Sequence, residues 1–222
     1  MKVVILAAGY ATRLYPITLN IPKCLLEYNN KKILDYILDD LHHPNIDEII
    51  IVTNNKFYIE LLDYRNNRLE NIKIINDKST DNSNRLGCIR DLLLAINNID
   101  DDVLIMASDN ILEFSINNFI DYFYIKSVSS IMYYEEFNMD KLRKTGQAII
   151  ENNKLIAFKE KPQVNISNNA CPPFYIINKN DLGYIKNIDV YYESLGDLIE
   201  YLSDKIEIKC YKMIGKRIDI GS

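Results

Sequence analysis

Apolar positions in the first half of the chain follow two alternating periodicities. Short continuous runs rich in β-branched residues predict buried strands at Val3–Leu6, Glu48–Val52, Ile72–Ile75 and Val103–Met106. Between these runs, apolar residues three and four positions apart predict helices near Ile33–Leu41, Lys56–Tyr64, Leu86–Ile96 and Ile116–Phe123, the last capped by Ser115. Such alternation is typical of a parallel sheet covered by helices on both faces. We therefore expect an α/β fold with a mostly parallel sheet.

The second half of the chain is richer in strands. Candidate strands lie at Ser129–Tyr134, Ala148–Glu151, Leu155–Lys159, Phe174–Ile177 and Glu207–Tyr211, with one helix near Leu195–Leu202. Asn152 and Asn153 separate two of the strands and predict a hairpin turn. We see neither a linker nor an internal repeat, so we expect one domain over residues 1–222. We divide this domain into a first half (about 1–125) and a second half richer in strands (about 126–222).

Charge and cysteine content limit the classes of partner. The net charge of −5 gives no general attraction for nucleic acid or anionic lipid, so any phosphate site must be local. No apolar run is long enough for a membrane span, and no signal peptide precedes the first strand. The four cysteines are scattered without a CxxC pair, which favours reduced thiols in a cytoplasmic protein.

A loop of small residues follows the first strand. It reads Leu6-Ala7-Ala8-Gly9-Tyr10-Ala11-Thr12-Arg13-Leu14-Tyr15-Pro16, with Pro22-Lys23 shortly after it. The carboxyl end of a parallel strand is where open α/β sheets bind ligands. Small residues let backbone N–H groups approach phosphate oxygens, and Arg13 and Lys23 add positive charge. Neither a Walker loop nor the GxGxxG dinucleotide pattern is present. The loop therefore predicts a phosphate site of another class.

This loop resembles the signature of the sugar-phosphate nucleotidyltransferase family. The match runs over Ala11-Thr12-Arg13-Leu14-Tyr15-Pro16-Ile17-Thr18 and Pro22-Lys23, with Ala11 where the family has a glycine. Three further motifs of the family occur in the expected order. They are Ala107-Ser108-Asp109-Asn110, Glu160-Lys161-Pro162 with Gly146 ahead of it, and Arg217-Ile218-Asp219-Ile220-Gly221-Ser222. The resemblance thus spans essentially the whole chain, and it implies a Rossmann-like nucleotide-binding first half and a more irregular, acceptor-binding second half.

The resemblance implies a role for each motif. Arg13 and Lys23 would be catalytic, Arg13 on the triphosphate and Lys23 on its α-phosphate. Leu6, Ala8, Gly9, Asn84 and Gly87 would bind the nucleotide, although Asn84 could equally be a helix N-cap. Gly146, Glu160 and Lys161 would bind the acceptor. Asp109 and Asp219 would be the ligands of Mg²⁺, which prefers hard oxygen donors. The substrates would be a nucleoside triphosphate and a sugar 1-phosphate.

The chemistry implied by this family needs cations more than a general base. A phosphate monoester with a second pKa of about 6 is already ionised near neutral pH, so its oxygen can attack without losing a proton to the protein. Catalysis must instead overcome repulsion between two anions. The two histidines, His42 and His43, are adjacent and lie far from every motif. We interpret them as a helix end outside the site.

Two alternatives remain open at this stage. The protein could be a cytidylyltransferase for a non-sugar phosphate such as phosphocholine, since such enzymes share the signature loop. It could also be a non-catalytic nucleotide-sugar-binding regulatory subunit, but that class loses the charged motif residues that are present here. The sequence does not determine the base, the acceptor or the oligomeric state.

Overall fold

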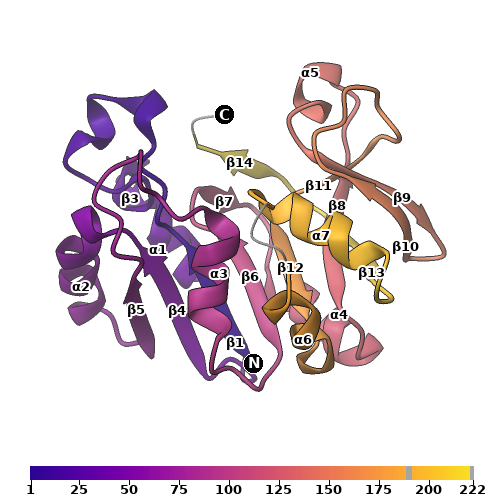
Figure 1. Ribbon diagram of the computed structural model, residues 1–222, viewed down its shortest axis with the longest axis horizontal. Coiled ribbons are helices and arrows are strands. Elements are labelled where there is room, and N and C mark those ends of the chain that lie inside the picture. The colour runs from indigo at the N-terminus through magenta and orange to yellow at the C-terminus, as the bar shows by residue number, and fades with distance from the viewer. Residues whose placement is uncertain (189–191, 221–222) are drawn as a thin grey trace.

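The computed structural model describes residues 1–188 and 192–220, and its centre is a ten-stranded sheet (Figure 1). The strand order is β11-β9-β10-β13-β8-β12-β6-β1-β4-β5. These strands are β1 (Lys2–Leu6), β4 (Glu48–Thr53), β5 (Ile72–Asn76), β6 (Val103–Ala107), β8 (Ser130–Glu135), β9 (Gly146–Glu151), β10 (Lys154–Lys159), β11 (Asn169–Cys171), β12 (Phe174–Ile177) and β13 (Lys209–Lys212).

Two pairs of short strands lie outside the large sheet. One pair is β2 (Glu27–Tyr28) with β3 (Lys31–Lys32), and the other is β7 (Asn110–Leu112) with β14 (Arg217–Asp219). The α-helices are α1 (Ile33–Leu38), α2 (Tyr58–Asn66), α3 (Cys88–Ile96), α4 (Asn117–Lys126), α5 (Met139–Leu142), α6 (Leu182–Lys186) and α7 (Leu195–Ser203). Among the described residues, no helix has the length and apolar character needed to cross a bilayer.

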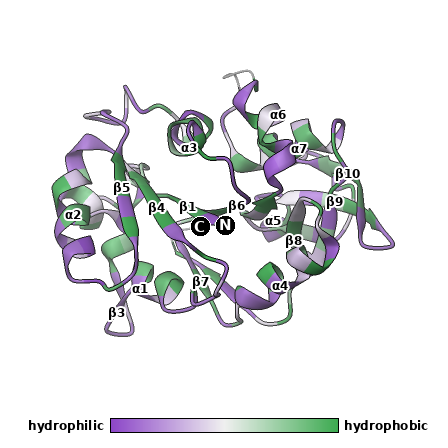
Figure 2. Ribbon diagram, turned by 90° about the horizontal axis from the view of Figure 1, so that it is seen from below, coloured by the Kyte–Doolittle hydropathy of each residue, from purple (hydrophilic) through white to green (hydrophobic). Residues whose placement is uncertain are grey.

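The regular half of the sheet is parallel, as the sequence predicts. Strands β5, β4, β1 and β6 are neighbours and all run in the same direction. Alternate residues of these strands face opposite sides, and both sides are apolar, so both faces need a cover. Val3 and Ile5 pack with α1, α2 and α4 on one face, whereas Val4 packs with α3, α6 and α7 on the other. Figure 2 shows the two helical layers on either side of the sheet.

The second half of the sheet is mixed. Strand β12 runs antiparallel to both of its neighbours, β6 and β8, and so joins the two halves into one continuous sheet. Strands β9 and β10 form the predicted hairpin, in which Asn152 (φ 50°) and Asn153 (φ 59°) both adopt positive φ. Two successive residues with positive φ are what a type I′ turn requires, and Asn tolerates this conformation. The α/β fold class with an irregular second half is therefore confirmed.

Several predicted helix boundaries are wrong. Helix α3 begins at Cys88 rather than Leu86, because Gly87 has φ 89° and ψ 154°, which are not helical. Helix α1 ends at Leu38, short of the predicted Leu41. Helix α4 begins at Asn117 with Ile116 as its N-cap, so the N-cap position does not belong to Ser115 as predicted. Ser115 Oγ still accepts a hydrogen bond from the Asn117 amide, and the Ile116 amide donates to Asp40, a distant residue that the sequence did not indicate.

Candidate active site

Three segments from distant parts of the sequence meet at one edge of the sheet. The loop after β1, the turn after β6 and the strand β14 all lie at the end of the sheet opposite the N-terminus (Figure 1). Strand β14 pairs with β7 in antiparallel register, so that Asp219 lies opposite Asn110. The Ile220 amide also donates to the Asp109 carbonyl at 3.0 Å. This pairing brings the two predicted metal ligands, Asp109 and Asp219, to the same place.

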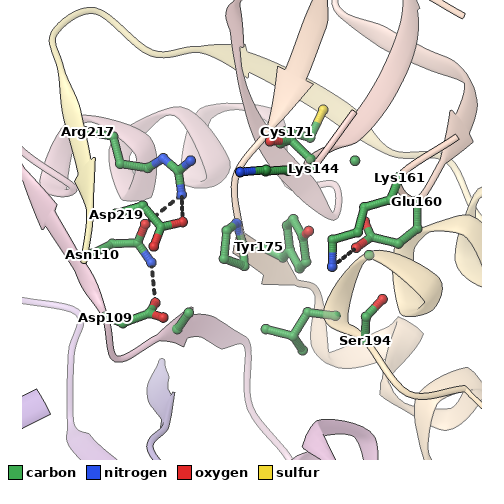
Figure 3. A pocket seen from close by; sticks show the side chains of 16 residues that line it. Asp109, Asn110, Lys144, Glu160, Lys161, Cys171, Tyr175, Ser194, Arg217 and Asp219 are labelled. Carbon is green, nitrogen blue, oxygen red and sulfur yellow. Dashed lines mark hydrogen bonds and ion pairs between the residues drawn. The ribbon is translucent and has the colours of Figure 1, made fainter. Parts of the chain in front are cut away.

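A network of charged side chains connects these acids. Lys23 Nζ lies 2.6 Å from Asp109 Oδ2, and Asn110 Nδ2 donates to the other oxygen of Asp109 at 2.8 Å. Arg217 Nη1 donates to Asn110 Oδ1 at 2.6 Å and lies 3.4 Å from Asp219 Oδ2 (Figure 3). Asp109 and Asp219 are about 30% exposed, at 31% and 29%, so their carboxylates remain accessible to a ligand. Sequence reasoning did not anticipate the role of Arg217 in this network.

Two carboxylates alone do not make a complete metal site. No group of three or more His, Cys, Asp or Glu side chains that could hold a metal occurs in the described part of the chain. Asp109 and Asp219 offer hard oxygen donors on paired strands, and both carboxylates are now balanced by cationic side chains. This donor set suits Mg²⁺ provided that phosphate oxygens supply further ligands, which is how proteins usually bind that ion.

Ala11 holds a conformation that normally favours glycine. Its φ of 47° and ψ of 41° place it in the left-handed region, at the position where the resemblance leads one to expect glycine. The buried Thr18 hydroxyl donates to the Ala11 carbonyl at 2.9 Å, and the Leu14 amide donates to the same oxygen. The loop therefore keeps its shape despite the alanine, at a cost of about 1 kcal/mol for a left-handed non-glycine residue.

Ala11→Gly is expected to stabilise the protein by about 0.5 kcal/mol, because relief of the left-handed strain outweighs the greater freedom of glycine in the unfolded chain. Ala8→Gly is the matched control, since Ala8 lies in the same loop without positive φ. It should lower the free energy of unfolding by a similar amount, about 0.5 kcal/mol. Urea denaturation of both variants measures the difference. A destabilised Ala11→Gly variant would contradict this account.

Three cavities beside the loop after β1 share Gly9 in their lining, and the two larger ones contain most of the charged and small residues of the loop. A wider one of about 880 Å³ contains Gly9, Arg13, Lys23, Arg85 and Asp109 among its lining residues, and Arg13 is exposed to it. A Cβ atom built on Gly9 would contact no atom within 4 Å, and Gly9 does not have positive φ. Neither packing nor backbone conformation therefore requires glycine here. The small size of Gly9 therefore matters only for a ligand that enters the cavity.

The second of these cavities, of about 520 Å³, lies between the β1 loop and α3. Leu6, Ala8, Gly9 and Gly87 all line it, in agreement with their predicted grouping. Asn84 does not line this cavity and lies in the loop between β5 and α3. Its Oδ1 accepts from the amides of Thr80 and Asp81, so its carbonyl group organises the turn before α3. It is not the N-cap of α3 either, since that position belongs to Gly87.

The predicted acceptor residues line a separate cavity of about 270 Å³ (Figure 3). Gly146, Glu160 and Lys161 come together here, and Lys161 Nζ lies 3.1 Å from Glu160 Oε1. Glu160 fits closely against two glycines: a Cβ on Gly146 would approach its Oε2 to 3.0 Å, and one on Gly196 to 1.8 Å. Burial raises the pKa of Glu160, while Lys161 lowers it. The sequence analysis missed Gly196, because only its contact with Glu160 shows that glycine is needed there.

Two acids are buried beside α3, and one of them, Asp91, lines the 520 Å³ cavity. Asp91 and Asp77 are each 5% exposed, and both Asp77 oxygens accept a hydrogen bond from the Ser79 hydroxyl. Asp91 Oδ1 is buried without a hydrogen-bonding partner among the described residues. Burial and the neighbouring Asp77 raise the pKa of Asp91 to about 7. We therefore expect Asp91 to keep its proton below about pH 7 and to share it there with Asp77.

This pair predicts a stability that falls as the pH rises. Because the unfolded Asp91 ionises near pH 4 and the folded Asp91 near pH 7, the folded state binds more protons between these two values. The free energy of unfolding should therefore fall progressively from about pH 4 to about pH 7 and stay level above it. At pH 8 the free energy of unfolding of Asp91→Asn should thus exceed that of the parent by at least about 1 kcal/mol, because the new amide donates to Asp77 at any pH. The advantage should vanish at pH 4. Urea titrations at both pH values test this, and a pH-independent difference would contradict it.

Comparison with known proteins agrees with this fold. The chain matches the nucleotidyl transferase family over residues 2–222, and it belongs to that family. It is similar to mannose-1-phosphate guanylyltransferase 1 of Arabidopsis thaliana, with 26% identity over 84% of this chain and 52% of that protein. The structure also resembles a UDP-glucose pyrophosphorylase complexed with UDP-glucose. In that comparison the TM-score is 0.84 and the identity 20%, over 100% of this chain and 93% of the other.

Two shorter matches concern cytidylyltransferases. A CTP:phosphoglutamine cytidylyltransferase of Campylobacter jejuni is 50% identical over 52 residues, which are 23% of this chain and 21% of that protein. A choline-phosphate cytidylyltransferase of Streptococcus pneumoniae is 38% identical over 84 residues, 38% of this chain and 36% of that protein. The chain spans about half the length of the Arabidopsis relative and a smaller share of these two. The family is therefore established, whereas the reaction is a separate question.

Proposed function

We propose that the protein condenses a nucleoside triphosphate with a sugar 1-phosphate, giving a nucleoside diphosphate sugar and pyrophosphate, and that it acts in the cytoplasm. One observation carries the proposal. The cavity lined by Arg13 and Lys23 and the cavity lined by Glu160 and Lys161 meet at two carboxylates, Asp109 and Asp219. A transfer between two phosphates needs this arrangement, in which one chamber for each substrate opens onto a shared centre.

The first chamber and the 520 Å³ cavity beside α3 would together bind the triphosphate. Backbone groups of Leu6, Ala8 and Gly9 would approach the nucleotide, with Gly87 and Asn84 on the side of the base. Arg13 would balance the charge of the departing pyrophosphate, and Lys23 would leave Asp109 to contact the α-phosphate. Electrostatic stabilisation of this type is generally the largest contribution to such a reaction. Gly9 would let the phosphates approach the backbone closely.

The residues of the second chamber would bind the acceptor. Glu160 would accept hydrogen bonds from sugar hydroxyls, and the Gly146 backbone would contact the ring. Lys161 would bind the acceptor phosphate. Asp109 and Asp219 would hold Mg²⁺, which when bound supplies positive charge to the phosphate oxygens. An acceptor oxygen would attack the α-phosphorus in line with the leaving pyrophosphate, without a covalent enzyme intermediate.

A substrate screen tests the proposal. The protein is incubated with each nucleoside triphosphate, Mg²⁺ and a panel of sugar 1-phosphates together with phosphocholine, and pyrophosphate release is followed. We expect release with at least one sugar 1-phosphate. Release with phosphocholine and CTP alone would favour the second candidate, a cytidylyltransferase for a non-sugar phosphate, which the two shorter matches support. Nucleotide binding without release would indicate a regulatory subunit.

A further inference from the structure

The two chambers share a small set of residues at their junction. Besides the carboxylates of Asp109 and Asp219, both cavities are lined by two lysines, Lys144 and Lys161. Lys161 belongs to a motif that the sequence analysis recognised, whereas Lys144 does not. Figure 3 shows the Lys144 side chain extending between the Arg217–Asp219 side of the cavity and the Glu160–Lys161 side. Lys144 therefore lies where two reacting phosphates would meet.

The backbone of Lys144 is held in place by a tight turn between α5 and β9. The Lys144 amide donates to the Lys141 carbonyl at 3.0 Å, and the Thr145 amide donates to the Leu142 carbonyl at 3.2 Å. The Thr145 hydroxyl also donates to the Lys141 carbonyl. At Gly146 the chain enters the sheet. The position of the Lys144 side chain is thus fixed at its base even though its end is exposed.

Lys144 differs from three other cations of the site in having no carboxylate partner among the described residues. Lys23 lies beside Asp109, Lys161 beside Glu160, and Arg217 beside Asp219, so each of these cations already faces a carboxylate. Within the described chain, the Lys144 ammonium has no ion pair and no hydrogen bond. Among these four cations it alone brings a positive charge to the junction without first leaving a carboxylate. An incoming dianion would meet this charge directly.

We propose that Lys144 binds the phosphate of the acceptor and, with Lys161, holds it against the α-phosphate of the nucleotide. This inference rests on the proposed function. In the reaction, an acceptor phosphate oxygen forms a bond to the α-phosphorus, the bond from that phosphorus to the bridging oxygen breaks, and the electron pair leaves with pyrophosphate. Lys144 reduces the repulsion between the two anions as they approach, and no proton transfer to the protein is needed.

The test compares Lys144→Met with Lys144→Arg and with Lys141→Met. Lys141 lies on the same turn but lines neither chamber, so it is a matched control. We expect Lys144→Met to lower kcat/KM for the acceptor about 10²-fold while changing KM for the triphosphate less than about twofold. Lys144→Arg keeps the charge and should remain within about tenfold of the parent. Lys141→Met should leave both constants unchanged.

Binding of inorganic phosphate, measured by ³¹P NMR, separates this inference from the proposed reaction. We expect Lys144→Met to weaken the affinity for inorganic phosphate at least about fivefold and Lys141→Met to leave that affinity unaltered. If no acceptor supports turnover but the phosphate affinity still falls in Lys144→Met, the reaction is wrong and the Lys144 site stands. Unaltered phosphate affinity, or a loss confined to KM for the triphosphate, would overturn the Lys144 site even in an active enzyme.

Discussion

Asp109→Asn is expected to lower kcat by about 10³-fold or more while leaving the fold intact. Asparagine keeps the size of the side chain and can still bond with Asn110, but it removes the charge that would attract Mg²⁺ and that now faces Lys23 at 2.6 Å. That ion pair is partly exposed, so its loss should change the free energy of unfolding by less than about 1 kcal/mol. Steady-state kinetics and urea denaturation measure the two effects.

Asp121→Asn provides the control for this experiment. Asp121 pairs with His43 at 3.1 Å and is 64% exposed, on helix α4 and away from both chambers. Its replacement should leave kcat unchanged. Titration with Mn²⁺ in the presence of nucleotide gives a second readout that is independent of turnover, and Asp109→Asn should bind this ion more weakly. Full activity of the parent in excess EDTA is the result that would rule out the metal site.

Gly196→Ala should impair acceptor use selectively. The new Cβ would lie 1.8 Å from Glu160 Oε2 and 2.3 Å from its Cδ, so the carboxylate must move away. Since this carboxylate ends a flexible side chain, the fold can adjust, and alanine also suits the first turn of helix α7 better than glycine. We expect kcat/KM for the acceptor to fall about 10²-fold with KM for the triphosphate nearly constant, because only the acceptor chamber loses a partner.

Gly183→Ala is the matched control for the helix. Gly183 lies in α6, and a Cβ there would contact nothing within 4 Å. The variant should have unaltered kinetics and equal or slightly higher stability. If Gly196→Ala kept normal acceptor kinetics while a crystal structure showed Glu160 displaced, Glu160 would have no role in binding the acceptor.

Local patterns predicted the parallel half of the sheet well, because each of its strands is apolar on both faces and is recognisable without knowledge of its partner. Strands β7 and β14 escaped prediction for the opposite reason. Each has three residues, and each is defined by hydrogen bonds to the other across a separation of more than a hundred positions. A window of sequence contains no record of such a pairing.

The residues of the candidate site divide in the same way, into those that stand in contiguous motifs and those defined only by distant contacts. Arg13, Lys23, Asp109 and Asp219 were recognisable because they stand in contiguous motifs, and the structure gathers them at one edge of the sheet. Lys144 and Gly196 were not recognisable. An exposed lysine after a short helix resembles any surface lysine, and a glycine inside a helix shows its purpose only when Glu160 is placed beside it. Residues 189–191 and 221–222 lie outside the described structure, and with them the end of the last motif.

The attachment of β14 would make the proposed activity more fragile than the fold. Asp219 is carried by a three-residue strand that pairs with β7 alone, outside the ten-stranded sheet. Short segments with few backbone bonds open at a lower free energy than the core that they border. Fraying of this strand would separate Asp219 from Asp109 while every strand of the main sheet stayed paired. Heat or mild denaturant would therefore abolish the proposed activity before it unfolds the protein, and an inactive sample could still have a native circular dichroism spectrum.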